Sequence, residues 1–345
     1  MRMDRLHTVP LPDRTALEQG LWHWLKAQPG PVWMTQPGQD PNRHRVVITL
    51  LHGNEPSGSH GVWHWLTRGE IPAVTCHFCL INLQAALAEP GFAHRHLPGQ
   101  PDLNRCFGTP AASESEHPAW QLTHALWQRI SALQPEAVVD LHNTSGSGPS
   151  FAVATVNDER HRALASLFTE RMLLTEVMLG ALMERTNTRF PIVTIECGGA
   201  VDPQAITVAS EGITRFCLAE AIDRVTEGDW RLEVLERPLR VQLSPGCAVD
   251  YAERPSDWAD LTLPPDIERL NFGWLGADEP LGWLGSLGLK AITVNDGHGQ
   301  LDPGSLFYQD GDRLCLAQGC KLFMITTHPQ IAVSDCLFYA VRAEE

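Results

Sequence analysis

Apolar residues recur with two different periods along the first two-thirds of the chain. Short runs rich in Val, Ile and Leu have the length and composition of buried strands. The longer stretches between them repeat apolar residues with the period of a helix. Strands that alternate with helices predict an α/β fold in which helices cover the faces of a sheet. We predict strands over residues 45–51, 73–82, 137–142, 150–156 and 191–196, helices over 15–28, 118–133 and 206–225, a helix from the turn at 52–58 through residue 66, and turn or loop regions over 29–42 and 91–108.

The pattern changes after residue 227, where short strand-like runs follow one another without helical stretches between them. Two intervening segments, Asn295-Asp-Gly-His-Gly299 and Gln309-Asp-Gly-Asp312, are strong turn sequences. We therefore predict two domains, an α/β domain over residues 1–228 and a smaller, mainly β domain over residues 229–345. The strand-like runs of the second domain are 230–243, 291–294, 313–316 and 321–326.

The composition is typical of a folded protein that binds neither nucleic acid nor membranes. With 43% hydrophobic residues, the 345-residue chain can bury a sizeable core, which excludes disorder as its main state. Its 26 basic and 41 acidic residues, a net charge of −15, form no basic stripe for nucleic acid phosphates. No apolar run approaches the roughly 20 residues of a membrane span.

The start of the chain and its cysteines predict a cytoplasmic protein. The first 15 residues lack the apolar block of a secretory signal. Nine cysteines, an odd number in a long chain, do not resemble a disulfide framework. The sequence leaves the oligomeric state open.

Four groups of polar residues lie where predicted strands end or in the loops between them. Ligands bind at the carboxyl ends of the strands in open α/β sheets, so side chains from separate motifs can converge there. The four groups are His52-Gly-Asn-Glu55, Asp102-Leu-Asn-Arg105, Asp140-Leu-His-Asn143 and Glu196.

Three of these residues have the identity and spacing of metal ligands. His52 and Glu55 are three residues apart on a turn that enters a helix, close enough to face one ion. Such a pair alone occurs often on protein surfaces, but His142 closes a strand where a third ligand is needed. Two histidines and one glutamate form the three-ligand arrangement of catalytic zinc, which leaves a fourth position open. Asp140 either orients one of the ligating histidines or caps the end of its strand.

The four motifs together resemble the succinylglutamate desuccinylase/aspartoacylase family, part of the zinc carboxypeptidase superfamily. The matching segments occur in the family's order, and the resemblance covers about residues 45–220 and continues weakly beyond. It implies a carboxypeptidase-like mixed central sheet flanked by helices, with the C-terminal β domain as a candidate cap over the active site. It also implies a zinc-dependent amidohydrolase that removes the acyl group from a small anionic N-acyl amino acid.

The resemblance assigns a role to each polar motif. One Zn²⁺ ion is bound by His52, Glu55 and His142, and Glu196 is the general base and acid. Zinc lowers the pKa of a bound water to about 7 and polarises the scissile carbonyl, and a carboxylate can then carry the proton to the departing amine. Arg95 corresponds to the arginine that stabilises the oxyanion.

A second group of residues is expected to bind the substrate. Asn104 and Arg105 match the family's pair that holds a substrate carboxylate, because arginine offers a planar fork of donors. Asn143 is a further candidate for substrate contact. A second carboxylate-binding arginine stays open between Arg185 and Arg189. Residues 327–331 contain no tyrosine where aspartoacylases place one that contacts the substrate, so the acyl group and the amino acid remain unspecified.

Two alternative functions use the same scaffold. One is a zinc carboxypeptidase or peptide amidase, and the other is a metal-binding protein without turnover. The presence of Glu196 and Arg95 argues against the second alternative, since loss of either is the simplest route to inactivity.

Other residues that could carry chemistry are given structural interpretations. His60 and His64 are spaced like the zinc ligands of a His-Glu-x-x-His helix, but no glutamate follows His60, which favours a helix surface. Cys76 and Cys79 lie in a strand-like run, where their sulfurs face opposite sides as core thiols. Cys197 has no pattern of a Cys/His pair and is not expected to be a nucleophile.

Overall fold

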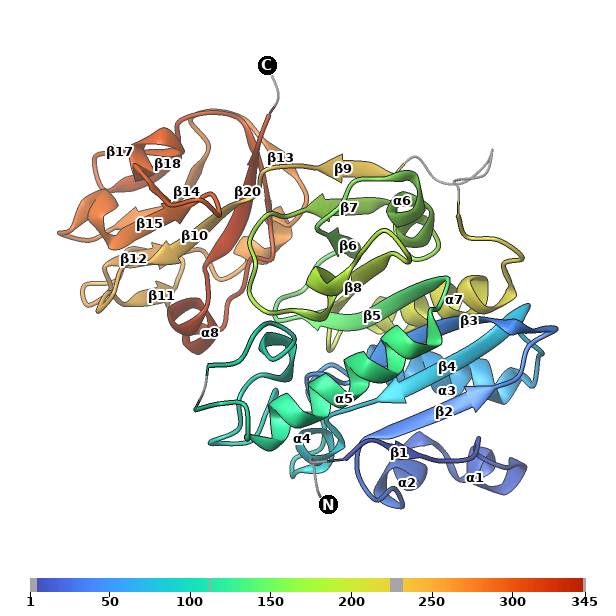
Figure 1. Cartoon of the computed structure of the whole chain (residues 1–345). Helices are drawn as coiled ribbons and strands as arrows, with labels where there is room; N and C mark the ends of the chain where they lie inside the picture. The colour runs from blue at the N-terminus through green and yellow to red at the C-terminus, as the bar shows by residue number, and fades with distance from the viewer. Residues whose placement is uncertain (1–4, 112, 224–231, 344–345) are drawn as a thin grey trace. The chain divides into compact units, whose positions relative to one another are not determined.

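The computed structural model describes residues 5–111, 113–223 and 232–343 (Figure 1). The chain divides into two units. The α/β unit consists of Met1–Asn143, Ser150–Leu174 and Met178–Val234. The β unit consists of Thr144–Pro149, Thr175–Val177 and Leu235–Glu345. The boundary predicted between residues 228 and 229 lies outside the described residues.

The strands predicted in the first part of the chain all lie in one mixed, nine-stranded sheet. Its strands are β1 (His7–Thr8), β2 (Val32–Gln36), β3 (Asp40–Thr49), β4 (Val74–Leu80), β5 (Ala137–Thr144), β6 (Phe151–Ala154), β7 (Arg171–Leu174), β8 (Ile192–Gly199) and β9 (Glu233–Leu235). Their order is β1-β2-β4-β3-β5-β8-β6-β7-β9. β3 pairs in parallel with both β4 and β5, so the ends of β3 and β5 lie at the same edge.

Helices cover both faces of this sheet, as the α/β prediction requires. The helices are α1 (Arg14–Gln19), α2 (Leu21–Lys26), α3 (Ser57–Arg68), α4 (Leu83–Leu87), α5 (Pro118–Leu133), α6 (Glu159–Ser166) and α7 (Pro203–Leu218), with short 3-10 helices η1 (Leu103–Arg105) and η2 (Leu182–Arg185). Successive strand residues face opposite sides. Val47 therefore packs in one apolar cluster with α2, α3 and α7, whereas Val46 and Ile48 pack in another with α5. Figure 1 shows α5 on one side of the sheet and α3 and α7 on the other.

Two predictions near the N-terminus are wrong in detail. The helix expected over 15–28 is two helices, because Gly20 between them has φ 91°, a left-handed value that a helix cannot contain. The turn region expected over 29–42 contains β2, whose residues Val32, Trp33 and Met34 are buried. This apolar run is too short to show a period, and it becomes a strand because it pairs antiparallel with β4.

Further along the chain, α6 and β7 were not predicted. α7 begins earlier than expected, at Pro203, where the missing N–H of proline is tolerated in the first helical turn. It ends at Leu218, since Ala219 has the extended ψ of 127°. The predicted end of this helix at residue 225 lies outside the described residues.

The β unit contains two further sheets, which confirms the mainly β prediction for the C-terminal part. The six-stranded sheet has the order β13-β19-β20-β10-β15-β16, and the five-stranded sheet has the order β11-β12-β14-β18-β17. Both predicted turns are hairpins, between β15 and β16 and between β17 and β18. The elements are β10 (Leu239–Leu243), β11 (Val249–Tyr251), β12 (Leu261–Leu263), η3 (Ile267–Leu270), β13 (Trp274–Leu275), β14 (Pro280–Leu284), η4 (Gly288–Ala291), β15 (Ile292–Asn295), β16 (Gln300–Leu301), η5 (Pro303–Ser305), β17 (Phe307–Asp310), β18 (Arg313–Leu316), β19 (Cys320–Phe323), α8 (Pro329–Ser334) and β20 (Phe338–Arg342).

The single run expected over 230–243 is divided. β9 and β10 are separated at Arg237, which has φ 54°, and at Pro238, which cannot donate a ladder hydrogen bond. Across the described part of the chain, no helix combines the length and apolarity that crossing a membrane requires.

Candidate metal centre

His52 and Glu55 lie on the turn between β3 and α3. This turn packs against α4 so closely that a Cβ on Gly53 would lie 2.5 Å from the backbone nitrogen of Ala86. A side chain at position 53 therefore has no room, which explains the glycine between the two polar residues. Both side chains are turned inward and are almost completely buried, with 3% and 6% of their surface exposed.

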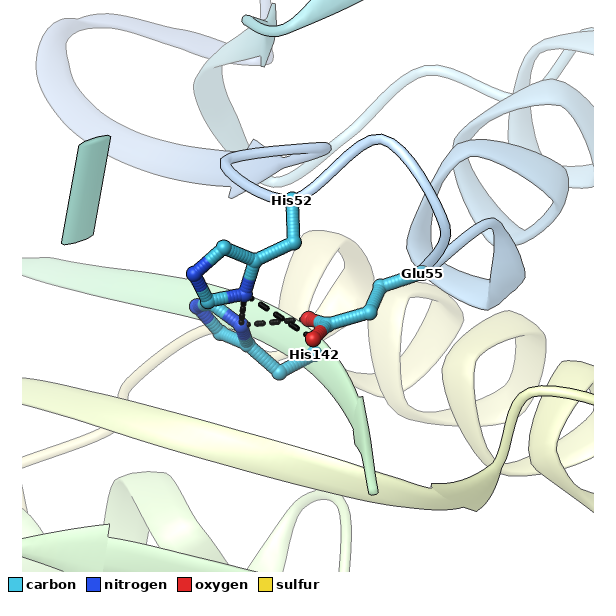
Figure 2. Close-up of side chains that lie close together, drawn as sticks. All are labelled: His52, Glu55 and His142. Atoms are coloured by element: carbon cyan, nitrogen blue, oxygen red, sulfur yellow. Dashed lines mark hydrogen bonds and ion pairs between the residues drawn. The ribbon is translucent and has the colours of Figure 1, made fainter. Parts of the chain in front are cut away.

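His142 reaches the same place from the neighbouring strand. Thr49, at the end of β3, is opposite Leu141 of β5, so the next residue of β5 lies beside the turn. His142 Nδ1 is 3.2 Å from His52 Nδ1 and 2.6 Å from Glu55 Oε2 (Figure 2). His52 Nδ1 is 2.9 Å from Glu55 Oε1. The structure thus brings together all three predicted metal ligands.

The donor set fits one small divalent cation. One ligand atom from each residue can be chosen so that all lie within 4.8 Å of one another. Two nitrogen ligands of a tetrahedral zinc ion, each 2.0–2.1 Å from it, are about 3.3 Å apart. The observed 3.2 Å between the two Nδ1 atoms matches this spacing. Two imidazoles with one carboxylate are also typical ligands of zinc.

Each imidazole is held from its other nitrogen by a carboxylate. His52 Nε2 is 2.8 Å from Asp102 Oδ1, and His142 Nε2 is 2.8 Å from Asp140 Oδ2. A carboxylate that accepts the Nε2–H leaves the Nδ1 lone pair for a metal and fixes the orientation of the ring. Of the two roles considered for Asp140, the structure favours the orienting one. Asp102 was given no role from the sequence, although it begins the Asp-Leu-Asn-Arg motif.

The charged groups at the centre shift one another's pKa values. Burial alone would raise the pKa of Glu55, but the adjacent His52 and His142 lower it below its usual range, so the carboxylate is ionised. Burial also opposes ionisation of Asp102, yet its hydrogen bond to His52 lowers its pKa well below the usual range. For His142 burial acts to lower the pKa, and the carboxylates of Asp140 and Glu55 outweigh it and raise the pKa well above the usual value. The carboxylates of Glu55 and Asp102 are therefore ionised before any ion binds, whereas His142 is protonated in the metal-free site and must release that proton to bind a metal.

Glu196 lies on β8, the strand next to β5 in the sheet. Its Oε2 atom is buried and has no hydrogen-bond partner among the described residues. Burial raises the pKa of Glu196 to about 7, although the nearby charge of His142 acts in the opposite direction. A carboxyl group with this pKa can both accept and donate a proton near neutral pH.

Arg95 contacts the metal-ligand cluster from a loop between α4 and η1. Its Nη1 donates to Glu55 Oε1 at 3.2 Å and its Nη2 to Asp102 Oδ2 at 2.9 Å. The backbone helps to hold the loop, because Gly53 N donates to Arg95 O. The Arg95 side chain is 42% exposed, so part of the guanidinium can also face solvent or a ligand.

The predicted substrate-binding residues have different surroundings. Asn104 is buried; its Oδ1 accepts from Leu182 N at 3.0 Å and its Nδ2 lies 3.4 Å from His142 Nε2. Arg105 is half-buried and donates to Asn104 O at 2.9 Å.

Asn143 contacts two other parts of the α/β unit. Its Nδ2 donates to Ser57 Oγ and Gly198 O, and its Oδ1 accepts from Ser57 N. The Oδ1 end of this amide thus joins β5 to α3, and the Nδ2 end joins β5 to both α3 and β8. Its contact with substrate stays a prediction.

The two arginines left open by the sequence contact other residues of the α/β unit, and which of them binds substrate stays open. The Arg185 guanidinium lies over the Trp127 ring, 4.7 Å from its centre, and Arg189 Nη1 donates to Gln134 Oε1 at 3.3 Å. Arg185 and Trp127 border a cavity of about 330 Å³ beside α5. None of the residues that line this cavity is a predicted metal ligand.

The structural interpretations of the remaining residues agree with the structure. Cys76 and Cys79 are buried on β4 and belong to separate apolar clusters, Cys76 with α3 and α7 and Cys79 with α5. His64 is exposed and His60 partly buried on α3. Burial raises the pKa of Cys197 well above its usual value, so its thiolate is disfavoured.

The fold and site define a recognisable class, a mixed α/β sheet with a His–Glu–His cluster at the ends of two parallel strands. Residues 43–219 match the family model described as the succinylglutamate desuccinylase/aspartoacylase catalytic domain. The chain belongs to this family, which confirms the resemblance found in the sequence.

Solved structures of the family have the same fold. A succinylglutamate desuccinylase/aspartoacylase from Rhodobacter sphaeroides is 14% identical with a TM-score of 0.54, and the match covers 91% of this chain and 88% of that one. Succinylglutamate desuccinylase from Chromobacterium violaceum is 14% identical with a TM-score of 0.55, covering 94% and 98%. Murine aminoacylase 3 is 16% identical with a TM-score of 0.51, covering 89% and 97%. No curated protein matches the chain.

Proposed function

We propose that the chain is a zinc-dependent hydrolase that removes the acyl group from a small anionic N-acyl amino acid. The family consists of deacylases, and the proposal extends this to a metal, a substrate class and named residues. The observation that carries it is the cluster of His52, Glu55 and His142 beside Glu196, with each imidazole backed by a carboxylate.

In this proposal His52, Glu55 and His142 hold one Zn²⁺ ion. When bound there, zinc supplies a Lewis acid that polarises a carbonyl oxygen and acidifies water. The buried Oε2 of Glu196 accepts the proton of the attacking water and returns it to the amine that leaves. Its pKa of about 7 suits both steps at neutral pH.

The cationic side chains near the cluster bind the anionic parts of the substrate. Arg105, with Asn104 beside it, binds the substrate carboxylate and orients the amide bond. Arg95 Nη1 lies 3.2 Å from Glu55 Oε1, at the edge of the cluster. From there the guanidinium donates to the carbonyl oxygen of the substrate, which becomes negative when water attacks the amide. Asn143 holds the end of β5 in place through Ser57 and Gly198, and substrate contact by this residue is the least supported part of the proposal.

The test measures metal content and amide hydrolysis on the same preparation. The protein is analysed for bound metal and incubated with N-succinyl and N-acetyl amino acids, and the free amine is quantified with and without a chelator. We expect about one zinc ion per chain, release of amine from at least one acidic substrate, loss of activity with chelator and recovery with Zn²⁺.

A Glu55→Gln variant should lose the metal, while Glu159→Gln, an exposed glutamate of α6, is the matched control. Full activity after complete removal of metal would contradict the proposal. Cleavage of peptides rather than acylated amino acids would favour a carboxypeptidase or peptide amidase. Stoichiometric zinc without turnover on either substrate class would favour a metal-binding protein.

A further inference from the structure

The segment Thr144–Pro149, here called the 144–149 loop, starts with the last residue of β5 and continues beyond the end of that strand. It begins one residue after Asn143 and two after His142. At its other end, β6 begins with Phe151, which pairs in register with Glu196 on β8. The 144–149 loop therefore joins the strand that carries a proposed ligand to the strand that pairs beside the proposed base. Its residues nevertheless belong to the β unit.

Glu268 of η3 holds this loop by its backbone. Its Oε2 accepts from Ser147 N at 2.9 Å. Its Oε1 accepts from both the backbone nitrogen and the hydroxyl of Thr327, each at 2.7 Å. One carboxylate thus joins the 144–149 loop to the segment after β19. Hydrogen bonds to a carboxylate are stronger than those between neutral groups.

Asn271 makes a second set of bonds to the same two segments. Its Nδ2 donates to Ser147 O at 2.7 Å, and its Oδ1 accepts from Ile325 N at 2.9 Å. Ser147 is therefore held at both its N–H and its C=O. All these residues lie in the β unit, so the contacts are internal to it.

At Gly146 the loop packs too closely against its neighbours for any side chain. A Cβ on Gly146 would lie 2.2 Å from Ile325 O and 2.9 Å from Glu268 Oε1. Within the loop, Thr144 Oγ1 donates to Gly146 O at 2.7 Å. The loop therefore has one defined conformation. Side chains of Thr144, Glu268 and Asn271 bind its backbone, and Gly146 lies where its backbone meets that of Ile325.

We infer that Glu268 and Asn271 are positioning residues, which hold the 144–149 loop and through it the end of β5 that carries His142. The β unit is then a working part of the hydrolase, because it fixes a segment covalently attached to the metal-binding strand. The activity part of this inference rests on the proposed function, whereas the structural part does not.

The test compares Glu268→Gln and Asn271→Ala with Glu279→Gln, an exposed glutamate of the β unit. Glutamine keeps the size of Glu268 but replaces one acceptor oxygen by an NH₂ group, so one of the acceptor sites is lost. Amide hydrogen exchange is measured on metal-free protein over residues 144–149, with α5 as an internal reference. Zinc dissociation, kcat and KM are measured on the loaded protein.

We expect exchange over 144–149 to rise about tenfold or more in both variants, with α5 and the control variant unchanged. Zinc should dissociate faster, because His142 is held less firmly at the end of β5. The kcat should fall while KM changes less, because the variants alter the position of His142 and remove no contact with the substrate. Unchanged exchange in both variants would overturn the inference. So would faster exchange with wild-type zinc dissociation.

The design separates two failures. If the wild-type protein turns over no substrate, the proposed function fails, and hydrogen exchange and zinc dissociation still decide the positioning role. If Glu268→Gln does not fold, Asn271→Ala tests the same loop, because it removes only the bonds to Ser147 O and Ile325 N.

Discussion

Replacement of Glu196 by glutamine separates the chemistry of this residue from its effect on stability. Glutamine has nearly the same shape but cannot accept the proton. General base and acid catalysis contributes about 10²–10⁴-fold to rate, or about 2.7–5.4 kcal/mol. We therefore expect kcat of the Glu196→Gln variant to fall by that factor with zinc still bound, since Glu196 makes no hydrogen bond to the ligand cluster through its buried Oε2.

The same change should stabilise the metal-free protein at neutral and higher pH. The pKa of Glu196 is about 7 in the folded chain, against roughly 4.3 for a glutamate in an unfolded chain. Between these values the folded state binds more protons than the unfolded state, so this residue makes stability fall as pH rises. If the whole difference in the pKa of Glu196 acted on folding, it would lower the free energy of unfolding by about 3–4 kcal/mol at pH 8. Because the side chain is partly exposed, we expect a smaller loss of about 1–3 kcal/mol.

The assay is urea unfolding of metal-free wild type and variant at pH 5 and pH 8, with exposed Glu170→Gln as the matched control. The Glu196→Gln protein should be the more stable at pH 8, and the difference should shrink at pH 5. Zinc content and hydrolysis are measured on the loaded forms. Wild-type kcat in the variant would refute the assignment of the base. Lower stability than wild type at pH 8 would refute the argument from burial.

Three further predictions concern other parts of the α/β unit. Burial lowers the pKa of His77 to about 4, so stability should fall as pH drops from about 6.5 to 4, by up to about 3 kcal/mol. Between about pH 4 and 6.5, the free energy of unfolding of His77→Gln, measured with urea, should depend less on pH than that of the wild type. The difference in slope corresponds to about one proton taken up on unfolding. Asp140→Asn should weaken zinc binding about 10–100-fold, measured by competition with a chelator; unchanged affinity would show that this carboxylate does not support the ligand. Arg105→Ala should raise KM about 10–100-fold without loss of zinc, and a change in kcat alone would contradict carboxylate binding by Arg105.

Sequence periodicity predicts the elements of the sheet best where burial is regular. The helix at 118–133 forms over the predicted residues because its apolar stripe packs against one face of the sheet. β2 was missed because its few apolar residues, between turn-forming residues, carry no period of their own. They become a strand only by pairing with β4, a long-range contact that local pattern does not encode.

The three residues of the His–Glu–His cluster could be predicted because their residue types and spacing are local signals. His52 and Glu55 are three positions apart, and His142 closes an apolar run that is clearly a strand. The support around them could not be predicted in the same way. Asp102 is far from His52 in the sequence, and only the packing of its loop brings its Oδ1 to 2.8 Å from His52 Nε2.

What the amino-acid sequence determines by itself is the class of fold, the order of the motifs and the residue types that form the His–Glu–His cluster. Tertiary structure decides which nitrogen of each histidine faces the cluster, how far Glu196 is withdrawn from water, and that the 144–149 loop joins the β unit. The physical reason is that periodicity and spacing report each residue's immediate neighbourhood. Hydrogen-bond partners and burial depend instead on strand pairing and loop packing between residues far apart in the chain.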